Sequence, residues 1–441
     1  MDERKTRRKN LLSYIIPSIG AMLVTSLYVV VDGIFVGQGV GYDALGAINI
    51  AGPFIMVVVA LSMMVTIGGA TLSAIALAKK EDKEASKYFT ISMALIMGFS
   101  ILMTLITTFF SEPIVRLLGA DDNLAKSSAT YLQYFVMFCV FFTSSQALAA
   151  FVRNDGSPNL SFVGMVAGGV SNIFLDWLFI FPLHMGIKGS AIASGLGQIL
   201  SFIILSSHFF KKTSKLRVTF SGFRGSDIVE ICKRGTPEFM NQLFQPVTVL
   251  CYNLLAMKTI GTIGVDAFSI VYYVLTITVA IFVGLTQGTQ PLISKAYGEG
   301  DNEGESYYFK AGAIINLGLS IVVYLFVALL GKQIIWCFNS DPKLIEVGYS
   351  CMLVYGISFL PTSILTVIIS RYTAIKDTLK ALILSSVRSL VLIPLCVFLT
   401  PMLFGDKAMW VGITIAEVIA IGIVFLMNYI SKKKASLHKE S

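Results

Sequence analysis

Charged residues are scarce in this sequence of 441 residues, and their scarcity excludes most kinds of soluble protein. Asp, Glu, Lys and Arg make up 14% of the chain, whereas a soluble globular domain carries about 25%. So few charges cannot cover a water-exposed surface, and 55% of the residues are hydrophobic. The composition excludes a cytosolic enzyme, a nucleic-acid-binding module and a secreted disulfide scaffold. It predicts a chain that lies mainly in lipid.

Residues that bind transition metals or form disulfides are also few. The six cysteines include no CxxC pair and most lie within apolar runs, so we interpret them as small buried hydrophobic residues. The three histidines lack the spacing of a zinc site. The sequence therefore predicts no cofactor and no enzymatic activity.

Long apolar runs, by contrast, are numerous. A helix needs about 20 mostly apolar residues to cross a bilayer, and twelve runs are long enough. Apolar residues surround each expected helix instead of forming one stripe, as lipid-exposed helices require. We predict an all-α membrane protein with twelve transmembrane helices. The expected spans are residues 11–36, 46–76, 88–110, 129–152, 159–182, 187–210, 228–257, 267–296, 307–330, 344–370, 381–403 and 408–430.

Basic residues fall mostly on one side of the expected membrane. With the N-terminus inside, the inner connections and tails hold 26 Lys and Arg, the outer connections hold 7, and Arg388 lies within a span. Connections rich in Lys and Arg stay in the cytoplasm. We therefore predict a multi-pass protein of the cell membrane with both termini cytoplasmic. The net charge of +8 is then a topology signal and does not indicate nucleic-acid binding.

The chain resembles itself at an offset of about 220 residues. Two examples are the pairs Pro17 and Pro237, and Asp121 and Asp341. We predict two pseudo-symmetric six-helix lobes, at residues 1–210 and 228–441, joined by a cytoplasmic linker at 211–227; the second lobe ends in a short cytoplasmic tail. Repeats with an even number of spans are parallel, and transporters built in this way bind substrate between the halves and alternate access.

An ionisable residue inside a span costs about 2.5–3.5 kcal/mol, so it is a functional candidate. Asp32 and Asp176 fall at similar depths in the outer half of the membrane, at a rise of about 1.5 Å per residue. Asn172 precedes Asp176 by four residues and shares its helix face, and Ser194 also lies in the outer half. The sequence predicts a cation-coupling site at Asp32, Asn172, Asp176 and Ser194. The alternative for each aspartate is an interfacial position near a helix end.

Such a site has two plausible occupants. Two carboxylates in a low dielectric repel each other, so one of them can hold a proton near neutral pH. The oxygens of Asp32, Asn172 and Asp176 could instead coordinate a small hard cation such as Na⁺. Pro17 should bend the first span, so that ion binding at Asp32 could switch its shape; packing is the alternative role for this proline.

Three further charges lie in the second half of the chain. Arg388 and Glu417 either form a structural ion pair or contact substrate. Glu238, next to Pro237, either contacts a cationic substrate or pairs with a neighbouring basic residue. We predict all three as candidate substrate-binding residues.

Several segments resemble the multidrug and toxic compound extrusion (MATE) family across essentially the whole chain. They are YIIPSIGAMLVTSLYVVVDGIFVGQGVG, which contains Pro17 and Asp32, SNIFLDWLFIF at 171–181, MGIKGSAIASGLGQ at 185–198, RGTPEFMNQ at 234–242 and IAEVIA at 415–420. The resemblance implies two six-helix lobes in a V shape and export of cationic, amphipathic drugs driven by inward H⁺ or Na⁺. It also implies that Asp32, Asn172, Asp176 and Ser194 match the coupling cluster of prokaryotic members.

These observations together predict a monomeric secondary antiporter that exports small organic cations. A lipid-linked oligosaccharide flippase is the alternative, but it would want a strongly cationic cavity, and Arg388 is the only cation clearly within a span. A membrane enzyme would need a catalytic constellation such as paired histidines, and a receptor or channel would need no ion gradient.

Overall fold

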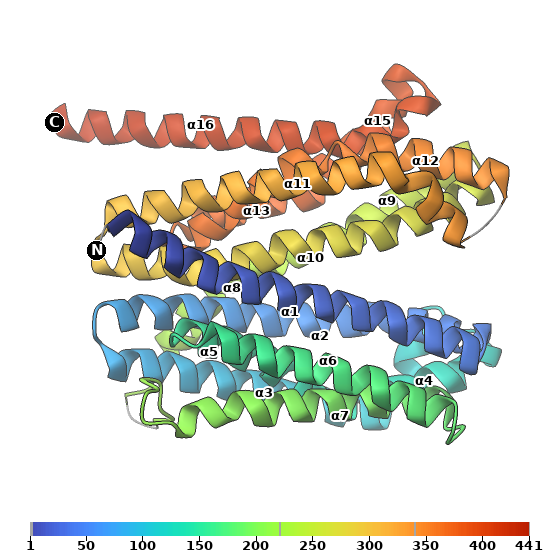
Figure 1. Ribbon diagram of the computed structural model, residues 1–441, viewed down its shortest axis with the longest axis horizontal. Helices are drawn as coiled ribbons and strands as arrows, with labels where there is room; N and C mark the ends of the chain where they lie inside the picture. The colour runs from blue at the N-terminus through green and yellow to red at the C-terminus, as the bar shows by residue number, and fades with distance from the viewer. Residues whose placement is uncertain (1–2, 220–221, 339–340, 441) are drawn as a thin grey trace. The chain divides into compact units, whose positions relative to one another are not determined.

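The computed structural model describes residues 3–219, 222–338 and 341–440 of the chain, and every regular element among them is helical (Figure 1). The chain divides into two compact units, which we describe separately. Residues 220–221 of the predicted linker lie outside the described residues, and the predicted lobe boundaries stay a prediction.

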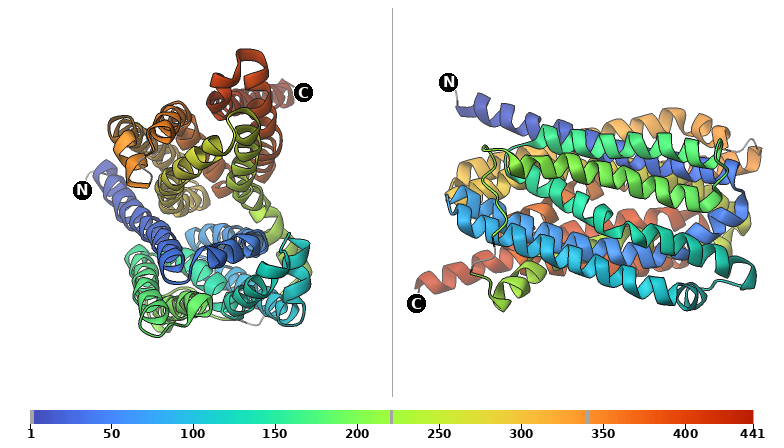
Figure 2. Two further views of the ribbon diagram at one scale, coloured as in Figure 1. Left: turned by 90° about the vertical axis from the view of Figure 1, so that its right-hand side faces the viewer. Right: turned by 90° about the horizontal axis from the view of Figure 1, so that it is seen from below.

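Unit 1 comprises Met1–Thr236 and Gln287–Glu305. Viewed along their axes, its helices form one bundle (Figure 2). The helices are α1 (Glu3–Gly39), α2 (Tyr42–Ala78), α3 (Asp82–Leu117), α4 (Asp122–Met137), α5 (Cys139–Asn154), α6 (Pro158–Ile180), α7 (Gly186–Ser206), the short 3₁₀ helix η1 (Ser207–Phe210), most of α8 (Gly225–Gln242) and the end of α10 (Thr262–Glu299).

Unit 2 comprises Pro237–Thr286 and Ser306–Ser441. It contains the end of α8, α9 (Phe244–Thr259), the first part of α10, most of α11 (Asn302–Phe338), α12 (Pro342–Gly356), α13 (Phe359–Ala374), α14 (Thr378–Ser386), the π-helical turn η2 (Val387–Leu392), α15 (Ile393–Phe404), the 3₁₀ helix η3 (Asp406–Val411) and α16 (Gly412–Glu440).

These helices coincide with the twelve predicted apolar runs. Within the described residues, nine helical segments are long and apolar enough to cross a bilayer, and two bent helix pairs raise the number to eleven. The bent pairs are α4 with α5 and α12 with α13, at angles of 48° and 42°. The remaining run, 228–257, corresponds to α8 and α9, which are interrupted at Leu243.

The local conformation repeats at the same offset of 220 residues as the sequence. Three positions with positive φ recur in this way: Gly41 and Gly261, Lys80 and Gly300, Gly156 and Lys376. Each pair lies in corresponding turns between helices. The two aspartates that match in the sequence also have the same role.

Asp121 and Asp341 are the N-cap residues of the first helix in each bent pair. The carboxylate of Asp121 accepts a hydrogen bond from the amide of Leu124, and that of Asp341 accepts one from the amide of Lys343, both at 2.9 Å. A capping carboxylate satisfies an amide that has no partner within the helix. The internal repeat is therefore structural as well as sequential.

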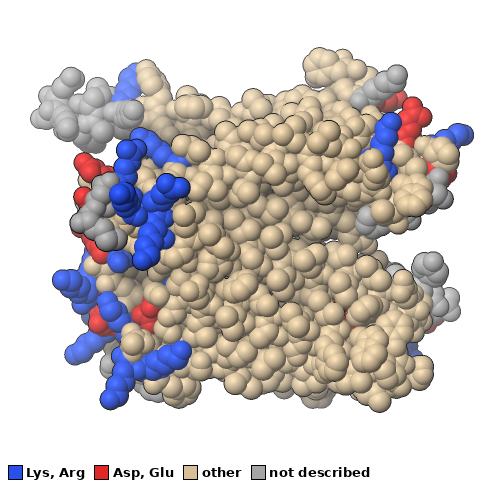
Figure 3. Space-filling view, viewed as in Figure 1, with Lys and Arg blue, Asp and Glu red and all other residues tan. Residues whose placement is uncertain are grey.

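The surfaces of the long helices suit contact with lipid. On the face seen in Figure 3, the charged side chains lie near the helix ends and uncharged residues cover the surface between them. On α11, the exposed Val322, Leu325 and Leu329 follow the helical spacing of three and four residues and form one apolar face. Such apolar exposure along helices of this length is expected in hydrocarbon.

Aromatic residues form the centre of the core of unit 2. The Tyr252 ring lies 5.0 Å from Phe268, 5.5 Å from Tyr355 and 5.6 Å from Trp410, measured between ring centroids.

Of the six cysteines, which we interpreted as buried, four are buried, at 139, 251, 351 and 396. Cys232 is half-buried, and the interpretation is wrong for Cys337, which lies one residue before the end of α11 and is exposed.

Candidate functional site

Helices α1, α6 and α7 of unit 1 carry the four predicted coupling residues. Asp32 lies on α1, Asn172 and Asp176 lie one turn apart on α6, and Ser194 lies on α7. Glycines let α6 and α7 approach closely: a Cβ added at Gly197 would lie 2.7 Å from the carbonyl oxygen of Gly168. The small residues therefore position the polar side chains of the two helices against each other.

Hydrogen bonds and proximity join these side chains into one cluster. The amide nitrogen of Asn172 donates to the hydroxyl of Ser194 at 3.1 Å. The hydroxyl of Ser190 donates to Asp32 Oδ1 at 2.8 Å. The carboxyl group of Asp176 is close enough to Asp32 and Asn172 to interact with both electrostatically. The structure thus brings the four predicted residues together.

Several oxygens in the cluster are buried and unsatisfied. Asp176 and Asn172 have exposed fractions of 0% and 1%. Within the described part of the chain, neither carboxylate oxygen of Asp176 accepts a hydrogen bond, and nor does Asn172 Oδ1. Buried polar atoms are normally paired, so these unpaired oxygens make the cluster a candidate site for a proton or a cation.

Residues that we did not predict also border the cluster. Besides Ser190, the phenols of Tyr28 and Tyr131 lie near enough to interact with both aspartates. Tyr28 precedes Asp32 by four residues, as Ser190 precedes Ser194, so helical spacing could have identified both. Tyr131 comes from α4 and carries no such signal.

The side chains of the cluster are not the ligand set of a transition-metal site. Among the described residues, no group of three or more His, Cys, Asp and Glu lies close enough to hold a metal ion. Sodium would instead be held by the two carboxylates together with neutral amide and hydroxyl oxygens, which are hard ligands.

In unit 2, the structure joins Arg388 and Glu417 in a buried ion pair. Arg388 Nη2 lies 2.6 Å from Glu417 Oε1, and Arg388 Nε lies 2.9 Å from Oε2. The hydroxyl of Thr362 donates to Glu417 Oε1 at 3.0 Å, and the guanidinium lies 3.9 Å from the centroid of the Phe244 ring. Arg388 lies in the π-helical turn η2, a feature that is often found at functional sites.

Glu238 is connected to this ion pair through one amide. Its carboxylate accepts a hydrogen bond from Gln242 at 3.0 Å, and Asn241 lies beside it. Asn241 in turn accepts a hydrogen bond of 3.4 Å from Arg388 Nη1. Glu238 is half-buried, whereas Glu417 is fully buried. All three predicted residues of the second half therefore belong to one cluster.

Pro17 lies inside α1, which continues through it as a single helix. Because proline has no amide hydrogen, the helix lacks one backbone hydrogen bond at this position. A bend that responds to ion binding stays a prediction.

The sequence profile of the MatE family matches residues 17–178 and 237–398. The chain belongs to the MatE family. The two matched segments are offset by 220 residues, so the profile detects the same repeat as the turn conformations and the helix caps do.

MatE relatives match along nearly the whole chain. The multidrug export protein MepA of Staphylococcus saprophyticus is 25% identical over 99% of this chain and 97% of its own length, and MepA of Staphylococcus aureus strain MRSA252 is 23% identical over 97% and 95%. Among solved structures, an outward-facing multidrug resistance MATE transporter matches with a TM-score of 0.90 at 22% identity, covering 99% and 97% of the two chains. A mutant of the Vibrio cholerae MATE transporter VcmN matches at 0.91 and 17%, covering 98% and 99%. The predicted twelve-helix fold with two lobes is confirmed.

Proposed function

We propose that this protein is a secondary active exporter that expels cationic amphipathic compounds in exchange for H⁺ or Na⁺. Two observations support the proposal. The relatives that align over nearly the whole chain are named multidrug export proteins. The chain also contains a fully buried aspartate, Asp176, beside the half-buried Asp32, and such a pair of carboxylates could take up a cation.

The unpaired oxygens of Asp176 and Asn172 beside Asp32 carry the proposal. Two neighbouring carboxylates within a membrane helix bundle cannot both stay charged at low cost, so uptake of a proton or Na⁺ stabilises the site. An ion that enters from the side of higher electrochemical potential removes one of the two negative charges and so relieves the repulsion between them. The ion thereby favours the conformation that binds it more tightly. An ion-driven switch needs this difference in affinity between two conformations.

Pro17 supplies the proposed link between ion binding and helix shape. It lies fifteen residues before Asp32 on α1, and its missing backbone hydrogen bond makes the helix easier to bend there. Neutralising Asp32 changes the forces on the second half of α1, because Ser190 on α7 holds its carboxylate by a hydrogen bond and the charge of Asp176 on α6 acts on it. A bend at Pro17 would then couple the ion site to the substrate site.

Glu238 is the proposed carboxylate for the organic cation. Its side chain is half-buried and has neutral amide neighbours in Gln242 and Asn241, so its charge can attract a cation. Arg388 and Glu417 neutralise each other, and through Asn241 the pair fixes the surroundings of Glu238. Direct contact of substrate with Arg388 or Glu417 stays a prediction.

The same ion pair disfavours the flippase alternative. A pyrophosphate-linked lipid would find no available positive charge at the predicted substrate residues, because the Arg388 charge is compensated by Glu417. For the proposed exporter, the distribution of Lys and Arg supports a multi-pass protein of the cell membrane with both termini in the cytoplasm. It would act as a monomer on small molecules without a cofactor.

The test is substrate efflux from proteoliposomes with Na⁺ and pH gradients imposed separately. We expect Asp32→Asn and Asp176→Asn each to lower ion-driven efflux at least about tenfold, because each variant lacks a carboxylate that can take up the proton or Na⁺; tenfold corresponds to about 1.4 kcal/mol. Asp121→Asn is the matched control, since it removes an exposed carboxylate and asparagine still caps α4. Efflux that stays equally ion-dependent in both variants would contradict the proposal.

A further inference from the structure

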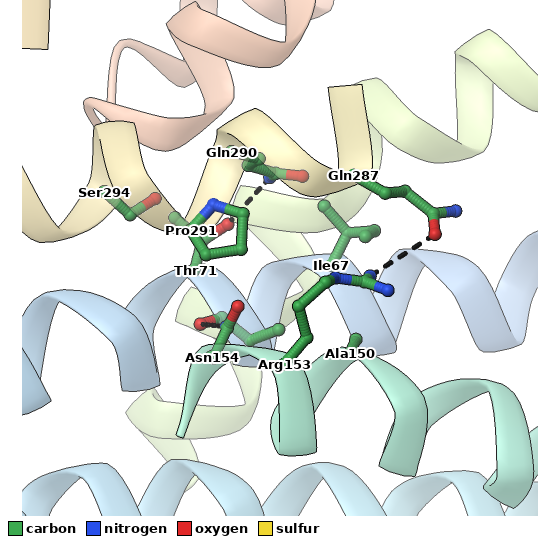
Figure 4. A pocket seen from close by; sticks show the side chains of 10 residues that line it. Ile67, Thr71, Ala150, Arg153, Asn154, Gln287, Gln290, Pro291 and Ser294 are labelled. Carbon is green, nitrogen blue, oxygen red and sulfur yellow. Dashed lines mark hydrogen bonds between the residues drawn. The ribbon is translucent and has the colours of Figure 1, made fainter. Parts of the chain in front are cut away.

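Unit 1 contains a second polar site, which neither ion coupling nor the substrate cluster uses. Helices α2, α5 and the end of α10 line a pocket around the side chain of Arg153 (Figure 4). Its other polar lining residues are Thr71, Asn154, Gln287, Gln290 and Ser294.

Arg153 brings an uncompensated charge into this pocket. Its side chain is almost fully buried, with 4% of the residue exposed. Its Nη2 donates to Gln287 Oε1 at 3.3 Å, but its Nε has no acceptor among the described residues. The lining includes no Asp or Glu, and the titratable neighbour that interacts with Arg153 is the Tyr14 phenol, which is ordinarily neutral near pH 7. Because a guanidinium does not deprotonate in proteins, the buried charge needs a counter-ion.

The remaining polar groups can donate hydrogen bonds to an anion. The Gln290 amide donates to the oxygen of Thr71 at 3.2 Å, so the Thr71 hydroxyl keeps its own hydrogen for another acceptor. Asn154 donates to the carbonyl oxygen of Ala70 at 2.7 Å, which holds its amide at the edge of the pocket. One positive charge surrounded by neutral amides and a hydroxyl suits a single negative charge.

We propose that this pocket binds one small monovalent anion, and that chloride is the physiological ligand. The apolar side chains of Ile67, Ala150 and Pro291 complete the lining and restrict the space. Phosphate suits the pocket less well, because it would bring four oxygens to a pocket that has a single charged donor. A bound chloride would accept from Arg153 and Thr71 and would hold the end of α10 against α2 and α5. The proposal does not depend on the direction or the substrate of transport.

Thermal unfolding of the purified full-length protein tests the proposal. Na⁺ concentration and ionic strength are kept constant while chloride or bromide replaces gluconate. We expect either halide to raise the Tm saturably, by about 2 °C at ten times its Kd. Arg153→Gln should abolish the increase. Arg116→Gln, which removes an exposed arginine paired with Glu112, should retain it. Equal Tm values in halide and gluconate, or an undiminished response of Arg153→Gln, would overturn the site.

Two further measurements keep the proposal testable even if Arg153→Gln does not fold. Gln290→Leu leaves the charge in place and should weaken halide binding about 2- to 10-fold through the altered contact with Thr71. Crystals of the unmodified protein grown with bromide should give an anomalous peak beside the Arg153 guanidinium. The absence of that peak would overturn the proposal. So would a co-purifying phospholipid, detected by native mass spectrometry in the unmodified protein and lost from Arg153→Gln, because the ligand would then be a lipid phosphate.

Discussion

At the scale of single residues, the two charged clusters differ in how completely their polar atoms are satisfied. The Glu417 carboxylate accepts hydrogen bonds from Arg388 and Thr362, as expected for a structural ion pair. Asp176 has no donor among the described residues although it is equally buried. Unpaired buried oxygens cost free energy, so their presence at one site points to a functional role there, such as binding an ion. This contrast is why we propose ion coupling for Asp176 and a positioning role for Glu417.

The ion pair leads to a prediction about stability. Glu417→Gln leaves the Arg388 charge buried without a partner, and we expect it to lower the free energy of unfolding by about 3 kcal/mol. The double variant Arg388→Met with Glu417→Leu should recover most of this loss, because apolar residues of similar volume often replace a buried ion pair at little cost. Thermal unfolding in detergent measures both effects.

Efflux assays on the same double variant then separate the two interpretations of the pair. We expect export to remain impaired in this variant, since Asn241 beside Glu238 loses its donor Arg388. Recovery of both stability and export would reduce the pair to a structural role.

The sequence could identify both aspartates and two neutral members of the first cluster, but not all of its neighbours. Asp32 and Asp176 stand out because ionisable residues inside apolar runs are rare. Ser190 could have been found from its spacing of four residues before Ser194, but Tyr131 could not, because tyrosine is common in membrane helices and nothing in the sequence links this one to the cluster. Depth along a helix is predictable from the rise per residue, whereas contact between helices is not.

At the scale of helices, the contact between α6 and α7 positions the coupling site. A Cβ at Gly197 would lie 2.7 Å from the Gly168 carbonyl oxygen and 3.1 Å from Asn172 Cβ. We therefore expect Gly197→Ala to separate the helices, at a cost of about 1–3 kcal/mol in stability. Because Asn172 bonds to Ser194 across the same contact, apparent affinity for the coupling ion should fall about 2- to 10-fold.

Gly98→Ala provides the control for this prediction. Nothing lies within 4 Å of a Cβ added at Gly98, and alanine favours a helix over glycine by up to about 1 kcal/mol. The control should be as stable as the unmodified protein or more so, with unchanged ion affinity in efflux titrations. Equal behaviour of the two variants would show that close packing of α6 and α7 does not hold the site.

The repeated turns lead to a second prediction at this scale. Lys80 adopts φ 62° in the turn where the second repeat has Gly300 at φ 74°. A residue with a Cβ pays roughly 1 kcal/mol in this region, partly offset because glycine makes the unfolded chain more flexible. Lys80→Gly should therefore raise the unfolding temperature slightly, and Gly300→Lys should lower it. Shifts of the same sign in the two variants would contradict this equivalence of the turns.

At the scale of the whole molecule, hydropathy predicted the fold because each crossing needs a run of about 20 apolar residues. The interruptions within runs were not predictable. The run that contains the 48° bend between α4 and α5 is as apolar as the run of a straight helix, so its hydropathy does not indicate the bend. The same holds for the break at Leu243 between α8 and α9. The repeat was visible from residues such as Asp121 and Asp341, whose caps the structure then explains. The fold and the four residues of the predicted coupling site thus followed from the sequence, while the bends and the remaining neighbours required the structure.

The orientation of the whole chain can be tested through Cys337, the exposed cysteine near the end of α11. If the N-terminus is cytoplasmic, as predicted, α11 crosses the membrane from the inside to the outside, so Cys337 near its end should face the exterior. We expect a membrane-impermeant maleimide to label it in intact cells and Cys337→Ser to abolish the labelling. Adding Ser207→Cys to that variant places a thiol at an exposed position after α7, on the predicted cytoplasmic side, which should react only after permeabilisation. The reverse pattern at the two positions would invert the topology, and with it the direction from which the coupling ion reaches Asp32.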